Sequence, residues 1–75
     1  MDYRNYIVSH SQLMLGKPVI KGTRITVELI LKKLSEGAST SDIVAAYPSV
    51  SPEAVNAVLA YAADVISNEF LISAA

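Results

Sequence analysis

The 75-residue chain contains no cysteine and no tryptophan, and it has one histidine. Without cysteine there can be no disulfide framework and no thiolate metal site to stabilise so small a domain. A chain of this length buries only about 60% of the surface that its unfolded state exposes. Its three prolines and three glycines are too few for a low-complexity segment. The sequence therefore predicts a single domain over residues 1–75, with extra stability supplied by another chain.

Long hydrophobic runs are missing as well. Polar residues such as Asn56 and Asp64 interrupt the apolar second half, and no stretch reaches the ~18 apolar residues that a spanning helix needs. Residues 1–6 lack the basic segment and long apolar segment of a secretory signal. We expect a cytoplasmic protein with no membrane partner.

Residues that could form a catalytic or metal site are scarce. His10 lies between Ser9 and Ser11, but adjacent residues rarely form a nucleophile and base in useful geometry. His10 and Asp2 do not have the spacing of a metal motif. Residues 16–23 do not follow the order of a phosphate-binding loop. We therefore expect neither an enzyme, nor a cofactor, nor a metal.

Basic residues are absent from the second half of the chain. Residues 1–37 hold all six Lys and Arg residues against three acids, a net charge of +3. Residues 38–75 hold four acids and no Lys or Arg, a net charge of −4. A polyanion should therefore bind the first half. The candidate nucleic-acid-binding residues are Lys17, Lys21, Arg24, Lys32 and Lys33.

The first 26 residues predict a short β element. Residues 6–8 and 23–26 are rich in β-branched and aromatic side chains, and Gly16, Pro18 and Gly22 mark turns between them. Pro18 should lie at an edge of the ladder or outside it. Two short strands are marginally stable alone, so we expect them to pack on helices.

Residues 27–72 predict three helices. The first covers residues 27–36, where aliphatic side chains recur at helical spacing. Thr26 can cap its start, and Gly37 stands where a left-handed residue commonly ends a helix. Glu28 and Lys32 should form an ion pair on its solvent face.

The second helix is short and covers residues 40–46. Ser39 and Asp42 have the spacing of a capping box, in which each side chain satisfies a backbone N–H of the other. Pro48 disfavours the helical conformation of the residue before it, so the helix should end there.

The third helix begins at Pro52 with Ser51 as its cap, and no later residue stops it before about residue 72. It is apolar around most of its circumference, which indicates burial on more than one side. In a domain this small, one of these sides should face a second copy of the chain. The predicted dimer interface contains Tyr61, Val65, Phe70 and Leu71.

This succession of helices is typical of a helix-turn-helix domain. In such a domain the third helix would enter the major groove of DNA and present Glu53, Asn56, Ala57 and Ala60. Asn56 could pair with adenine, but Glu53 would repel phosphate and no cation is near. We interpret the third helix as a packing helix, so DNA binding would fall to the basic half.

The segment GKPVIKGTRITV, residues 16–27, is distinctive. Through it the chain resembles a prokaryotic family of domains of unknown function, number four hundred and thirty-three in the DUF series. Residues 34–39, Ile43, residues 47–48 and residues 60–62 are also similar to that family. The resemblance extends over residues 6–64 and implies a mostly α fold, with a tri-helical, homeodomain-like helix-turn-helix core and a short N-terminal β segment.

The resemblance also implies a function. Members are often regarded as VapB-type antitoxins that bind a partner toxin, frequently a PIN-like nuclease, and can repress their own operon. The leading hypothesis is therefore a homodimeric antitoxin. The alternative is a free-standing DNA-binding regulator that uses the basic half. A neighbouring gene for a PIN-like protein would favour the first hypothesis.

Overall fold

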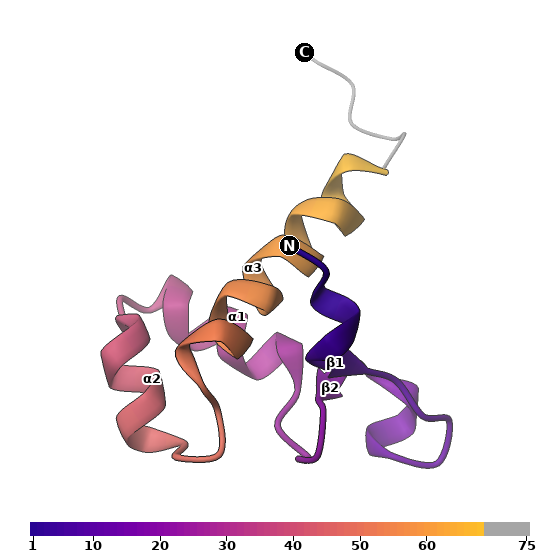
Figure 1. Ribbon diagram of the computed structural model, residues 1–75, viewed down its shortest axis with the longest axis horizontal. Coiled ribbons are helices and arrows are strands. Elements are labelled where there is room, and N and C mark those ends of the chain that lie inside the picture. The colour runs from indigo at the N-terminus through magenta and orange to yellow at the C-terminus, as the bar shows by residue number, and fades with distance from the viewer. Residues whose placement is uncertain (69–75) are drawn as a thin grey trace.

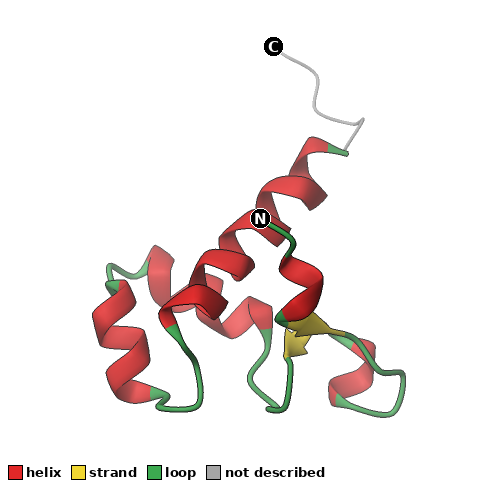
Figure 2. Cartoon of the chain, in the orientation of Figure 1, coloured by secondary structure: helices red, strands yellow, loops and turns green. Residues whose placement is uncertain are grey.

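The computed structural model describes residues 1–68 of the chain. Within them, three α-helices enclose one core, and a two-stranded antiparallel sheet lies beside the helices (Figure 1, Figure 2). The prediction of a mostly α fold with a short N-terminal β element is confirmed. The elements in chain order are η1 (Tyr3–Asn5), β1 (Ile7–Val8), η2 (Met14–Gly16), β2 (Val19–Ile20), α1 (Val27–Ser35), α2 (Thr40–Ala46) and α3 (Pro52–Ser67).

The core is built from aliphatic side chains of all three helices and both strands. Ile30 of α1, Ile43 of α2 and Val55 of α3 are almost fully buried, as is Val50 between α2 and α3. Among the described residues, no polar or charged side chain is buried. Hydrophobic burial therefore provides the main stabilisation of the fold.

The sheet differs from the sequence prediction in its second strand. β1 pairs with Val19–Ile20, not with residues 23–26. The Thr23 hydroxyl donates to the Ile20 carbonyl oxygen at 2.8 Å and accepts from the Ile25 N–H at 3.0 Å. These local bonds, together with the positive φ of Gly22 (80°), bend residues 21–25 into a turn instead of a strand.

Thr26 joins the hairpin to α1. Its backbone forms an isolated antiparallel bridge with Val19, and its side-chain hydroxyl accepts from the Leu29 N–H at 3.0 Å as the N-cap of α1. The next N–H, of Val27, donates to the Pro18 carbonyl oxygen at 3.0 Å. α1 ends one residue earlier than predicted, and Gly37 follows with a φ of 101°.

The predicted boundaries of α2 and the predicted start of α3 are confirmed. The Asp42 N–H donates to Ser39 Oγ at 3.0 Å, and the Ser39 N–H donates to Asp42 Oδ2 at 2.9 Å, which completes the capping box. At α3, Ser51 Oγ accepts from the Ala54 N–H at 3.1 Å and Pro52 is the first helical residue.

α3 ends at Ser67, earlier than the predicted residue 72. Ser67 Oγ and Asn68 Nδ2 both donate to the Asp64 carbonyl oxygen, at 2.8 Å each. Such local side-chain bonds compete with continuation of a helix. The last turns of α3 project beyond the other elements, as Figure 1 shows.

Candidate interaction surfaces

The basic half of the chain does not carry its charges in one cluster. Lys17 Nζ lies 2.9 Å from Glu28 Oε1, and this ion pair holds the pKa of Glu28 below its ordinary value. The predicted pair between Glu28 and Lys32 is therefore replaced by a partner eleven residues earlier in the chain. In residues 1–68, Lys21, Arg24, Lys32 and Lys33 form no ion pair.

Four of the five predicted nucleic-acid-binding residues line three separate hollows, and the fifth, Lys21, is exposed in the turn after β2. Arg24 lines one hollow with His10 and Leu13, at the turn after β2. Lys17 and Lys32 line a second with Met14 and Leu29. Lys33 is half-buried and lines a third, against α2. The structure thus brings Lys17 and Lys32 together, and it places Lys33 on another side of the domain.

The start of α3 exposes only some of the residues that a DNA-reading helix would present. Glu53 and Asn56 are exposed, but Ala57 is fully buried in the core. Of these residues, Ala57 cannot contact DNA, because its side of α3 packs on the rest of the domain. This agrees with the interpretation of α3 as a packing helix.

Of the four residues predicted to form a dimer interface, Tyr61 contacts its own chain. Its ring meets the ring of Tyr3 edge to face, with 5.3 Å between centroids and 81° between planes. Val65 is 46% exposed. Phe70 and Leu71 lie outside the described residues.

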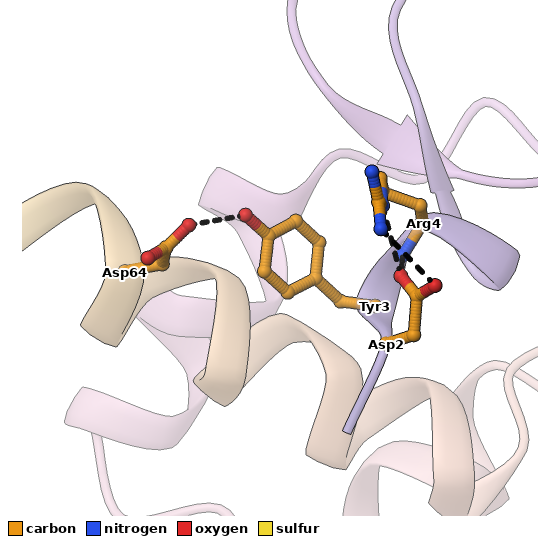
Figure 3. Close-up of polar contacts among 4 residues, drawn as sticks. All are labelled: Asp2, Tyr3, Arg4 and Asp64. Carbon is orange, nitrogen blue, oxygen red and sulfur yellow. Dashed lines mark hydrogen bonds and ion pairs between the residues drawn. The ribbon is translucent and has the colours of Figure 1, made fainter.

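A hydrogen bond joins the N-terminal segment to α3, and an ion pair lies beside it within the segment (Figure 3). The Tyr3 hydroxyl donates a hydrogen bond to Asp64 Oδ2 near the end of α3. This bond raises the pKa of Tyr3 above its ordinary value, since only the neutral hydroxyl can donate. Beside it, Arg4 Nε donates to Asp2 Oδ1 at 3.0 Å and lowers the pKa of Asp2. Sequence reasoning missed this clamp, because its two ends lie 61 residues apart.

Two exposed apolar surfaces remain in the described part of the chain. The first is on α3, where Leu59 in the middle of the helix and Val65 and Ile66 at its end are 47%, 46% and 66% exposed. The second is the turn at η2, where Leu15 is 94% exposed. The apolar circumference of α3 signalled the first surface. Nothing in the residue types signalled the second, because Met and Leu rarely adopt the left-handed conformation of that turn.

Two kinds of site receive no support within residues 1–68. No group of three or more His, Asp or Glu side chains is arranged to hold a metal ion. None of the described helices combines the length and apolarity required to cross a bilayer.

Comparison with known proteins places the chain in a family. Neither the curated proteins nor the solved structures contain a match. Residues 7–62, which extend from β1 to the middle of α3, match the family described as Protein of unknown function (DUF433). This stretch contains the hairpin, the Lys21–Arg24 turn and all three core-forming helical segments. The match covers well over half of the chain and agrees with the resemblance of the GKPVIKGTRITV segment, so the chain belongs to the DUF433 family.

Proposed function

We propose that this chain is a homodimeric protein-binding module that acts as an antitoxin. The observation that carries the proposal is the exposed apolar surface of α3, with Val65 and Ile66 at its projecting end and Leu59 in its middle, each about half exposed or more. Small monomeric domains rarely leave several large apolar side chains of one helix exposed unless a partner covers some of them. The end of α3 is the surface we assign to the second copy.

The partner toxin is proposed on charge and on family resemblance. Residues 38–75 carry four acids and no Lys or Arg. The substrate-binding surface of a nuclease must be basic to bind phosphates. An acidic, apolar half-domain complements such a surface and would compete with nucleic acid for it. This supports a PIN-like nuclease as the partner.

The dimer is tested with Ile66→Asp and Val65→Asp. Both side chains are exposed, so the variants should fold, and an added charge should oppose burial against a second copy. We expect wild type to be a dimer and both variants to be monomers in light scattering. Asn56→Asp, at an exposed polar position of the same helix, is the matched control and should remain dimeric. A monomeric wild type at 100 µM would exclude the dimer.

Antitoxin action needs a separate assay. The product of the adjacent reading frame is expressed with and without this chain, and growth of the host is followed. We expect growth arrest by that product alone and rescue on co-expression. Rescue by wild type but not by Glu53→Lys, which reverses the charge of an exposed acid on α3, would locate the binding surface. Absence of any interaction between the two purified proteins would remove the toxin from the proposal.

A second candidate, a DNA-binding regulator, is favoured by one observation. Lys21, Arg24 and Lys32 are exposed and form no ion pair within residues 1–68. A gel shift with the chain's own upstream DNA tests this function. Binding should weaken steeply with salt, and the double variant Lys21→Ala/Arg24→Ala should reduce the slope of log K against log salt by about 2. No shift at 20 mM salt would reject this function.

A further inference from the structure

The turn at η2 holds an apolar side chain away from the domain. Met14, Leu15 and Gly16 have φ values of 51°, 58° and 80°, so three successive residues are left-handed. Leu15 is 94% exposed, more than any other large apolar side chain in residues 1–68. A bulky residue in this conformation carries strain. Leu15 buries almost none of its surface within its own chain, so packing there does not offset the strain.

The turn is closed by its own hydrogen bonds. The Leu13 N–H donates to the His10 carbonyl oxygen at 3.0 Å, and the Gly16 N–H donates to the Leu13 carbonyl oxygen at 3.0 Å. Ser9 Oγ also donates to the Gly16 carbonyl oxygen. The backbone at Leu15 is therefore held in place, so the turn loses little backbone entropy when a partner covers it.

Cations lie on both sides of this turn. Leu13 lines a hollow with His10 and Arg24. Met14 lines another with Lys17 and Lys32, which also contains Glu28, the partner of Lys17. The surface that fits the Leu15 turn is therefore apolar and bordered by acidic groups.

The chain itself has such a surface at the end of α3. Val65 and Ile66 are exposed there, next to Asp64, which lines a hollow with Met1, Asp2 and Arg4. Arg4 is already paired with Asp2, so Asp64 has no ion-pair partner within residues 1–68. If the ends of α3 from two copies met each other, two Asp64 carboxylates would approach, and the Arg4 beside each is already paired with Asp2. Contact between the α3 end of one copy and the Leu15 turn of another places opposite charges together instead.

We propose that the end of α3 docks on the Leu15 turn of a second copy. In a twofold dimer this contact occurs twice, once in each direction. Figure 1 shows the α3 end and the loop of residues 9–17 at opposite ends of the domain, so one chain cannot make the contact with itself. The inference rests on the homodimer proposed above and names both sides of its interface.

Cross-linking tests the contact directly, because the chain has no cysteine of its own. Leu15→Cys and Ile66→Cys chains, one of them carrying an affinity tag, are mixed and oxidised under mild conditions. The expected result is a disulfide between the two different chains, at least tenfold more abundant than either homodimeric product. A dominant product from Ile66→Cys alone would show that two α3 ends meet, and would overturn the inference.

A charge substitution provides the second measurement. Leu15→Asp should raise the dissociation constant of the dimer at least tenfold, because it removes a buried leucine and adds an acid opposite acids. Gln12→Asp, at an exposed position of the same loop, adds the same charge and should change the constant by less than threefold. Circular dichroism confirms that both variants fold.

Salt distinguishes the two arrangements further. Raising NaCl from 50 to 500 mM should weaken a contact between opposite charges and strengthen one between like charges. If Leu15→Asp forms a dimer as strongly as wild type does while Ile66→Asp is monomeric, this inference is overturned and the proposed dimer stands. A monomeric wild type would overturn both.

Discussion

The Tyr3 hydroxyl donates a hydrogen bond to the Asp64 carboxylate, and the Tyr3 ring meets Tyr61 one helical turn earlier on the same helix. One side chain of the N-terminal segment thus makes a polar and an aromatic contact with α3. The two contacts hold η1 against the helix beside the point where α3 leaves the core.

Removal of the Tyr3 hydroxyl should loosen this clamp. Tyr3→Phe keeps the ring contact and loses the hydrogen bond, so we expect a small decrease in melting temperature and faster amide exchange in residues 3–8. Tyr3→Ala loses both contacts and should have the larger effect. Arg4→Gln, which breaks an exposed ion pair nearby, is the control and should leave exchange in α3 unchanged.

The capping box of α2 should make the stability of the domain depend on pH in the acid range. The Ser39 backbone N–H lowers the pKa of Asp42 below its ordinary value of 3.8. The stabilisation from Asp42 is therefore complete above about pH 4 and is lost as the pH falls through the lower folded-state pKa. Urea titrations between pH 5 and pH 2 should show a smaller loss of stability for Asp42→Asn than for wild type. Equal losses would show that the carboxylate is not bound to the cap.

Truncation of a buried isoleucine should remove a large fraction of the domain's stability. Ile43 is 1% exposed and lies where α2 meets α3, so Ile43→Ala should cost about 2–5 kcal/mol. Domains of this size are stable by only about 5–10 kcal/mol. Ile43→Val, the conservative control, should cost about 1 kcal/mol in guanidinium unfolding. A cost below 1 kcal/mol for the alanine variant would contradict the described core.

Leu15→Asn should stabilise the isolated chain and weaken the dimer. Asparagine tolerates the left-handed conformation better than leucine, so the isolated chain should gain about 1 kcal/mol in unfolding free energy. The same substitution removes the apolar side chain that we propose docks on α3, so the dimer should weaken. Leu15→Val is the control and should lower the unfolding free energy of the isolated chain, because a β-branched residue is most strained in that conformation. Unfolding is measured at a concentration below dimer formation.

Local signals explain why the helix starts were predictable. Thr26, Ser39 and Ser51 each cap the helix that follows, and the bond from each hydroxyl spans three residues. Such short-range chemistry is readable from residue types alone. The hydrophobic pattern of α1 likewise predicted the burial of Val27 and Ile30.

The incorrect predictions depend on contacts or conformations that residue types do not reveal. Strand propensity favoured residues 23–26, but the Thr23 hydroxyl bonds to the turn and ends the strand. Lys17 reaches Glu28 only because the hairpin folds back on α1. The left-handed Leu15 has no counterpart in the pattern, since leucine disfavours that conformation.

Thr26 belongs to the hairpin through its backbone and to α1 through its hydroxyl. A two-residue strand pair has too little cohesion to persist by itself. Sheet and helix should therefore open together as a single cooperative unit, with matched hydrogen-exchange protection at Ile20 and Leu29. A molecule that binds the Lys21–Arg24 turn would then stabilise α1 without contacting it.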